Sequence, residues 1–463
     1  MTRVTAEAPE RPRTARRRAG WAGGLAALLV ALIGVALLHP ASALAAPQAS
    51  SATVQTSDPS SITFKVRVTA DADIATATLN YKTLNPTGNS IGGSLRAEAS
   101  GRTADVSVQL QTNNNERYNP IGTLYKYSWT IVDKNGATTT TPEQDYTFLD
   151  GRFQWQSKTR EGVTVYWYAS EPLADRALNS AIASIKTSET LLSVKLGYPI
   201  RLIIWRNSAE AKAAQQPRSA SFDSQIVTGG SRVGIDLLHI YDPLDGFDDV
   251  VRHETGHILT KVAGDGSVAT LPSWIDEGTA VYVQTSPGAG YEQAVKFAIA
   301  ADSVIRLRNM SSNANQANQV NLFYGQSWSV VKFMVDTYGQ AKFAAIFKSI
   351  KDGSPIDDAL QANINVDQDG LYNAWRAKNG LKTIDFPPVA RATSVAGVQA
   401  TRAPLGIPTS VNSAESTSGS GGAEATSPAA AAGGNVLVVG IGAVVVAAIL
   451  GFFAWRLSRK PSA

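Results

Sequence analysis

The sequence predicts a multidomain protein in which an all-β domain precedes an α+β domain, followed by a low-complexity stalk and a membrane-spanning helix. Three observations support this order. Short runs of alternating apolar and polar residues recur before residue 150, helical periodicity follows, and an uncharged apolar stretch lies near the C-terminus. The chain has 463 residues, of which 44% are hydrophobic, so it is long enough for two or three domains with cores.

The first 45 residues have the pattern of a secretory signal. An arginine cluster between Arg3 and Arg18 precedes the apolar stretch Trp21 to Leu38, and Ala43-Leu44-Ala45 matches the small-x-small pattern of signal peptidase sites. We therefore expect residues 1–45 to be a cleaved signal peptide. An uncleaved anchor of similar length is the alternative.

Residues 51–150 are expected to form a β-sandwich of immunoglobulin or fibronectin type. Apolar and polar residues alternate in short segments, as they do in half-buried strands, and Asn135-Gly136 favours a tight hairpin turn between two of them. Strands at this spacing are typical of antiparallel sandwiches. The predicted strands are 62–68, 74–81, 106–110, 125–132, 138–141 and 146–149.

Residues 151–390 are expected to form an α+β domain. Apolar residues at helical spacing between Leu178 and Leu196 are followed by Gly197, which is placed to cap a helix. The predicted strands are 163–168, 199–205 and 232–237. After a helix that ends before Gly264, the predicted helices are 272–284, 291–301, 327–338, 342–351 and 369–377.

The stretch His253-Glu254-Thr255-Gly256-His257 carries the chemistry of this domain. Residues i and i+4 share one face of a helix, so both imidazoles can bind one metal ion while Glu254 stands beside it. Only four histidines occur in the chain, which makes a chance pairing at this spacing unattractive. The usual alternative for a single histidine, a hydrogen-bonded core position, fits this pair poorly.

Glu277, in the next predicted helix, is the expected third metal ligand. Two imidazoles and one carboxylate are a typical zinc donor set, and a fourth position left to water makes such a site catalytic. Asp276 is a competing ligand, but neighbouring helical residues point about 100° apart, so only one of the two can face the ion. Asp248 and Asp249 are candidate hydrogen-bond partners of a ligand imidazole, although a solvated helix start is the preferred interpretation of both.

At these residues the chain resembles the gluzincin metallopeptidases, and more closely the bacterial peptidase MA-like proteins. The HExxH run and the motif Trp274-Ile275-Asp276-Glu277-Gly278-Thr279-Ala280 carry the resemblance, which extends over roughly residues 153–380. It implies a gluzincin-type catalytic domain, Zn²⁺ as cofactor, and a peptide or protein substrate cleaved with Glu254 as general base. It also implies that a strand at Val233-Gly234-Ile235 borders the substrate cleft, with ordinary sheet structure as the alternative.

The resemblance further implies a tyrosine that donates a hydrogen bond to the oxyanion of the reaction. Tyr324 is the candidate, and His239 is the alternative because it is the only spare histidine in the region. The chain departs from thermolysin at Val281, where that enzyme has an aspartate that supports a metal ligand. It departs from the membrane alanyl aminopeptidases because it has no G-x-M-E-N segment.

The C-terminal part is predicted to hold the protein at a membrane. Residues 391–434 are rich in Ala, Ser, Thr and Gly and are expected to be a disordered linker. Residues 436–455 are apolar and uncharged, which predicts a transmembrane helix, and the basic tail 456–463 is expected to be cytoplasmic. The predicted location is therefore the cell membrane, single-pass, with the catalytic part extracytoplasmic.

Composition excludes two classes of function. The net charge of +4 is small and part of it lies at the two ends, so a nucleic-acid partner is not expected. The absence of cysteine excludes a cysteine nucleophile and a disulfide scaffold. The alternative to an enzyme is a catalytically idle, metal-stabilised surface binding or adhesion module. The presence of Glu254 disfavours that alternative, because this glutamate is not needed to hold zinc.

Overall fold

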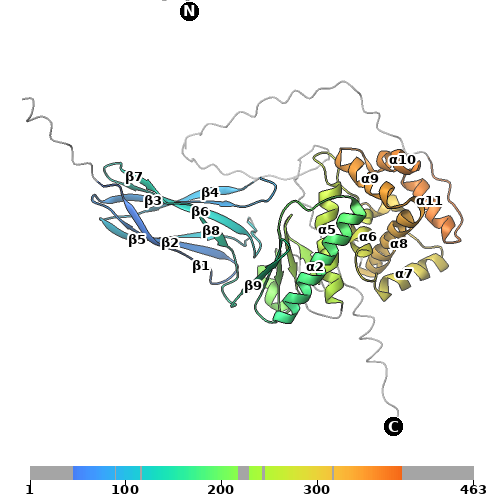
Figure 1. The fold of residues 1–463 in the computed structure, drawn as a ribbon, viewed down its shortest axis with the longest axis horizontal. Helices are drawn as coiled ribbons and strands as arrows, with labels where there is room; N and C mark the ends of the chain where they lie inside the picture. The colour runs from blue at the N-terminus through green and yellow to red at the C-terminus, as the bar shows by residue number, and fades with distance from the viewer. Residues whose placement is uncertain are drawn as a thin grey trace, which may run out of the picture.

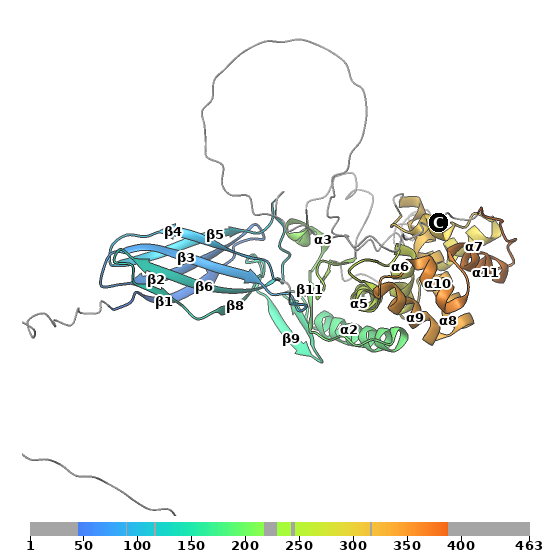
Figure 2. The same ribbon diagram turned by 90° about the horizontal axis from the view of Figure 1, so that it is seen from above.

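The computed structural model describes residues 45–88, 90–114, 117–216, 229–241, 246–314 and 317–387. A β-sandwich lies at one end of the molecule and a group of helices at the other, with a mixed β-sheet between them (Figures 1 and 2). The strands of the sandwich come first in the chain, and most of the helices follow the last strand of the central sheet.

Two antiparallel sheets form the sandwich. One has the strand order β1-β2-β5 and the other β4-β3-β6-β7, with β8 also paired to β6. Alternation along β2 buries Ile62, Phe64, Val66 and Val68, which share one core with residues of β6 such as Trp129. The strands are β1 Gln48–Gln55, β2 Ser61–Thr69, β3 Ile74–Thr83, β4 Gly92–Glu98, β5 Thr103–Gln111, β6 Leu124–Asp133, β7 Thr138–Thr140 and β8 Gln144–Thr147.

The central sheet has the order β12-β13-β11-β10-β9. Its inner strands β10, β11 and β13 are parallel, whereas the edge strands β9 and β12 pair antiparallel with their neighbours. The parallel strands are almost wholly apolar because both faces of the sheet are covered. The bounds are β9 Gln156–Arg160, β10 Val163–Trp167, β11 Ile200–Ile204, β12 Gly230–Arg232 and β13 Leu237–Ile240.

One face of the central sheet packs against helices and the other against the sandwich. Leu202 and Leu238 belong to the helical core, whereas Ile203, Trp205 and Leu237 belong to the core of the sandwich. At this junction the buried Arg201 donates to the Gly122 carbonyl and pairs with Asp236. The sandwich and the central sheet therefore share a core and are not joined only by a chain segment.

The helical part begins with α2 (Glu171–Leu192), which lies beside α5 (Phe247–Gly264) (Figure 1). Short α3 (Ser208–Ala211) precedes the β12 region. The helices that follow α5 are α6 Ser273–Tyr282, α7 Ala289–Ala300, α8 Val320–Tyr338, α9 Gln340–Lys351, α10 Ile356–Ile364 and α11 Gln368–Lys378. Their apolar faces form one large core with the central sheet.

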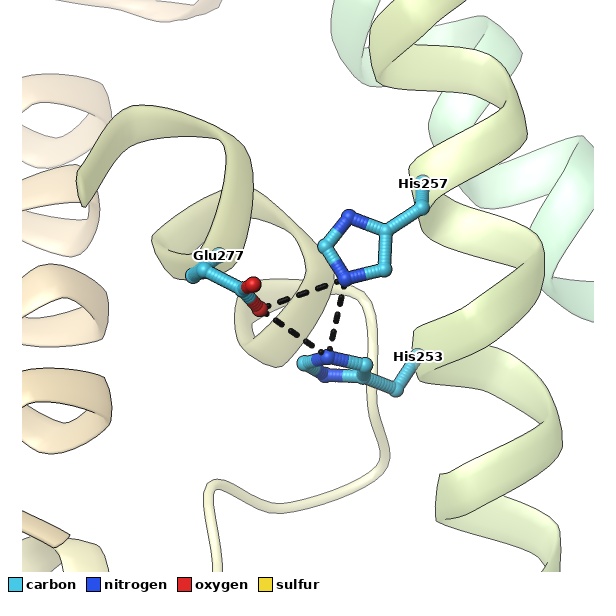
Figure 3. A group of neighbouring side chains, drawn as sticks. All are labelled: His253, His257 and Glu277. Atoms are coloured by element: carbon cyan, nitrogen blue, oxygen red, sulfur yellow. Dashed lines mark hydrogen bonds and ion pairs between the residues drawn. The ribbon is translucent and has the colours of Figure 1, made fainter. Parts of the chain in front are cut away.

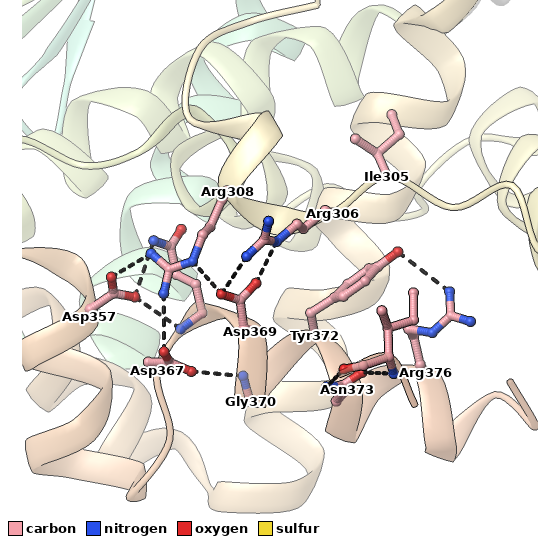
Figure 4. Close-up of polar contacts among 12 residues, drawn as sticks. Ile305, Arg306, Arg308, Asp357, Asp367, Asp369, Gly370, Tyr372, Asn373 and Arg376 are labelled. Carbon is pink, nitrogen blue, oxygen red and sulfur yellow. Dashed lines mark hydrogen bonds and ion pairs between the residues drawn. The ribbon is translucent and has the colours of Figure 1, made fainter. Parts of the chain in front are cut away.

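An ion-pair network fastens the last helices to the turn at Leu307–Met310 (Figure 4). The Arg308 guanidinium lies 2.6 Å from Asp357 and 2.5 Å from Asp369, and Arg306 also contacts Asp369 at 2.6 Å. These groups are largely shielded from solvent. The opposite charge beside each one offsets the cost of removing it from water.

Two predicted strands are displaced in the structure. The predicted strand 232–237 spans the turn between β12 and β13, where the amides of Val233 and Gly234 donate to the Leu237 carbonyl. The last predicted strand of the sandwich, 146–149, is β8 at Gln144–Thr147. The coarser prediction, an all-β region followed by an α+β region, is confirmed. The immunoglobulin or fibronectin type stays a prediction.

The predicted single-pass membrane location is contradicted. Among the helices of the described residues, none combines the length and the apolar character that a bilayer crossing requires. The longest, α2, is a surface helix that carries charged residues such as Lys186 and Glu189 among its exposed or half-buried positions. The segments expected to be a signal peptide, a linker, a transmembrane helix and a tail (1–45, 391–434, 436–455 and 456–463) lie outside the described residues, apart from residue 45.

Candidate active site

Helices α5 and α6 bring His253, His257 and Glu277 together (Figure 3). The two Nε2 atoms are 3.1 Å apart, and Glu277 Oε2 lies 3.3 Å from Nε2 of His253 and 3.2 Å from Nε2 of His257. All three side chains are buried. Within the described part of the chain, this is the group of histidines and carboxylates whose donor atoms lie near enough to hold one metal ion.

The three donor atoms fit zinc. Tetrahedral zinc bound at about 2.0–2.1 Å separates neighbouring ligand atoms by about 3.3–3.4 Å. The three separations in this site, 3.1, 3.2 and 3.3 Å, are close to that value. Two imidazole nitrogens and one carboxylate oxygen supply three ligands, which leaves the fourth position of a catalytic zinc site to water or substrate.

Gly278, the residue after the carboxylate ligand, lets α6 approach α8 closely. A Cβ atom at Gly278 would lie 2.4 Å from the Ser327 carbonyl oxygen of α8, which leaves no room for a side chain. Glu277 and Gly278 are about 100° apart around α6, so one faces α5 while the other touches α8. The Glu-Gly pair therefore lets α6 lie between α5 and α8, with Glu277 directed at the two histidines of α5.

Asp276 does not replace Glu277 in the cluster, because it contacts Nδ1 of His257, whereas the cluster is formed at Nε2. Its Oδ1 lies 3.0 Å from His257 Nδ1 and 2.5 Å from the Thr260 hydroxyl, and its Oδ2 lies 2.9 Å from Lys261 Nζ. Burial alone would raise the pKa of Asp276, but the charges of His257 and Lys261 hold it well below its usual range. Asp276 is thus an anionic acceptor that orients the His257 ring.

Gln284 makes the corresponding contact with the other imidazole. Its Nε2 lies 3.2 Å from His253 Nδ1. A metal held by Nε2 of His253 would leave the imidazole proton on Nδ1, and the Gln284 amide, turned over, would offer Oε1 as its acceptor. Val281, where thermolysin has an aspartate that supports a metal ligand, is buried in the apolar core and contacts neither ring. In this chain Gln284 contacts the ligand imidazole instead.

Asp248 and Asp249, the other candidate hydrogen-bond partners of a ligand imidazole, make different contacts. Asp248 pairs with Arg176 of α2 and accepts a hydrogen bond from Ser180. Asp249 accepts hydrogen bonds from the backbone amide and the hydroxyl of Thr285. Both aspartates thus hold the start of α5 in place, and neither contacts a ligand imidazole in the contacts described.

Glu254 lies on the same helix, completely buried, and neither of its carboxylate oxygens has a hydrogen-bond partner. Burial raises the pKa of Glu254 above its usual value, and the nearby imidazoles oppose this rise. A buried carboxylate without partners is costly unless a ligand or water satisfies it. Such a group is well suited to accept a proton from a water molecule.

Two tyrosines, not one, lie at the cluster. The Tyr324 ring of α8 has its centroid 6.0 Å from that of His253, and it stacks at 5.5 Å on Tyr291 of α7. Burial raises the pKa of Tyr291, and the nearby carboxylates of Glu277 and Glu254 raise it further. Tyr291 has no motif in the sequence that marks it, and only the packing of α7 on α8 places it here.

His239, the alternative oxyanion donor, faces away from the cluster. Its Nε2 lies 2.7 Å from the carbonyl oxygen of Ile121 in the sandwich, and its ring packs near Trp205 and Tyr241. The carbonyl can only accept, so Nε2 carries the proton. Burial lowers the pKa of His239 to about 4. A neutral histidine at the domain junction leaves Tyr324 as the candidate donor.

Residues 182–379 match the model of the Peptidase MA superfamily, a match that covers less than half of the 463 residues. A search of curated proteins returned no match.

Three solved structures are among those that match parts of this chain. The M1 zinc metallopeptidase of Deinococcus radiodurans is 11% identical over 74% of this chain and 95% of its own, with a TM-score of 0.31. Aminopeptidase A of Legionella pneumophila, solved with aspartic acid, is 11% identical over 70% and 48%, with a TM-score of 0.30. OgpA of Akkermansia muciniphila is 9% identical over 22% and 27%, with a TM-score of 0.18, so this chain spans about a quarter of its length. The superfamily match supports a peptidase-like assignment for residues 182–379.

Proposed function

We propose that this protein is a zinc-dependent peptidase that hydrolyses peptide bonds in a peptide or protein substrate. The observation that carries the proposal is the buried triangle of His253, His257 and Glu277 beside a carboxylate, Glu254, that has no partner. A module that only held zinc would not need that carboxylate. The proposed peptidase domain spans residues 151–390 and the proposed sandwich domain residues 51–150.

His253, His257 and Glu277 would hold the zinc ion, with Asp276 and Gln284 fixing the two imidazoles. Bound there, zinc would polarise the scissile carbonyl and lower the pKa of a water molecule. Glu254 takes the proton of the attacking water and later delivers it to the leaving amine.

The oxyanion formed by attack on the carbonyl needs a hydrogen-bond donor. Tyr324 is the proposed donor, because its ring lies beside His253 and the stacked Tyr291 holds that ring in place. β12 is the edge strand of the central sheet and its Gly230 lies against Glu254, so an extended peptide is proposed to pair along β12. This position replaces Val233-Gly234-Ile235 as the proposed border of the cleft.

The test uses the full-length chain. After zinc reconstitution and desalting, mass spectrometry of metals should find about one zinc per chain, and an unfolded protein substrate should be cleaved. Glu254→Gln should keep the zinc and lose the cleavage. Asp248→Asn is the matched control, because it removes a carboxylate from the same helix that pairs with Arg176 instead.

Two results would contradict the proposal in different ways. A wild-type chain without zinc would exclude the metal site. A zinc-loaded chain whose activity is unchanged by Glu254→Gln, or that cleaves nothing, would instead favour the metal-stabilised binding module.

A further inference from the structure

Arg232 lies on the edge strand β12, on the face that looks toward α5. In an antiparallel pair, residues directly opposite each other project to the same face of the sheet. Arg232 pairs with Leu238, and Gly230 pairs with Ile240; both apolar partners belong to the core under the helices. Arg232 therefore projects to the same face as the site.

The same strand touches the proposed general base. A Cβ atom at Gly230 would lie 2.8 Å from Glu254 Cγ, so only a glycine lets Glu254 stand against β12. Two residues along a strand cover about 7 Å. Arg232 is two residues beyond Gly230, which places its backbone within about one or two substrate residues of the bond to be cut.

Arg232 forms no ion pair at bonding distance in the described part of the chain, although its charge lies near enough to Glu254 to oppose the rise in the pKa of that carboxyl. Its Nε is buried and has no hydrogen-bond partner, and its one hydrogen bond runs from Nη1 to the Gly234 carbonyl at 3.3 Å. The buried or half-buried Arg201, Arg308 and Arg376 all form ion pairs. A guanidinium that is shielded from water and has an N–H without an acceptor lowers the stability of the fold. A bound carboxylate would offset that cost by pairing with the charge.

We propose that Arg232 binds a carboxylate of the substrate, so that the enzyme favours peptides with a carboxylate within two residues of the cleaved bond. The guanidinium contacts the Gly234 carbonyl through Nη1, which leaves Nη2 to donate a charge-assisted hydrogen bond to a carboxylate. The carboxylate is the side chain of Asp or Glu, or the C-terminal carboxylate of a short peptide. This inference rests on the proposed peptidase function.

The experiment compares matched peptides on the zinc-loaded full-length chain. Quenched-fluorescent peptides carry Glu or Gln at each position within two residues of the cleaved bond, each with a free or an amidated C-terminus. For wild type we expect kcat/KM to be about 10–100-fold higher for the acidic peptide, the range of a hydrogen bond to a charged group. The position or terminus that carries the effect identifies the source of the carboxylate.

Three substitutions separate recognition from a structural role. Arg232→Gln should reduce the Glu-to-Gln ratio to about 1, and this ratio is the readout because loss of the Arg232 charge also acts on Glu254 and so on the rates for both peptides. Arg232→Lys should retain part of the preference, and Arg232→Glu should favour a Lys peptide. Arg67→Gln is the control for net charge, since this exposed arginine pairs with Asp105 on the sandwich. A structural role would lower the rates for all peptides equally.

The results that overturn the inference differ from those that overturn the peptidase. Equal cleavage of Glu and Gln peptides by wild type, or an unchanged ratio in Arg232→Gln, excludes carboxylate recognition by Arg232. If wild type cleaves no peptide, the proposed function fails. Calorimetric binding to the Glu254→Gln chain then tests Arg232 independently: tighter binding of acidic peptides that Arg232→Gln abolishes supports the inference, and equal binding excludes it.

Discussion

Acidification should weaken the junction between the sandwich and the central sheet through His239. This residue is completely buried, its Nε2 donates to the Ile121 carbonyl, and burial lowers its pKa from 6.5 to about 4. Above pH 6.5 the imidazole is neutral in both the folded and unfolded chain. Between pH 6.5 and 4 the unfolded chain binds a proton that the folded chain does not, so the free energy of unfolding falls as the pH falls.

The size of this effect follows from the shift in pKa. Within that pH window the free energy of unfolding should decrease by about 1.4 kcal/mol per pH unit because of His239 alone. Over the whole shift, the loss approaches about 3 kcal/mol at pH 4. For a protein stabilised by about 5–15 kcal/mol, such a loss is easily measured.

The assay is urea unfolding followed by tryptophan fluorescence at several pH values from 7 to 4, for wild type and His239→Gln. Glutamine can still donate to the Ile121 carbonyl but does not titrate. Carboxylates and the other histidines affect both proteins alike, so the difference between the two curves isolates His239. The difference should change by about 3 kcal/mol between pH 7 and 4. Parallel curves would refute a buried neutral His239.

Four further predictions concern the candidate active site. Glu254→Gln should lower peptide hydrolysis by about 10²–10⁴ while metal analysis still finds zinc; equal activity would exclude Glu254 as the base. Tyr324→Phe should lower kcat by about 10²–10³ with little change in KM, whereas a rise in KM alone would assign it to substrate binding. Tyr291→Phe keeps the stacked ring and should cost less in kcat than Tyr324→Phe; a larger cost would make Tyr291 the donor. Asp276→Asn should weaken zinc binding by about 10–100-fold in competition with a fluorescent chelator, and His257→Ala should abolish it; unchanged affinity in Asp276→Asn would deny its orienting role.

The sequence alone predicts those parts of the protein that depend on local periodicity. Alternating residues locate most strands of the sandwich, because a strand with one buried face repeats every two residues. The spacing of His253 and His257 predicts two imidazoles on one helical face, and the structure brings Glu277 to them. These features need only a few neighbouring residues to be recognised.

Tertiary packing decides the rest. Asp276 supports His257, and Gln284 supports His253, because α6 packs on α5 and the chain just after α6 stays close to it. Tyr291 reaches the site only because α7 packs on α8, and no short motif encodes that contact.

The same reason explains the misplaced predictions. Apolar periodicity at 232–237 does not distinguish a strand from the turn that joins two short strands, and it does not show which strand is at the edge of the sheet. His239 was a candidate by its chemistry, but the alternation of side chains along β13 turns it toward Ile121 of the sandwich. Sequence patterns specify which faces are apolar. The neighbour that covers each face is decided by contacts between residues far apart in the chain.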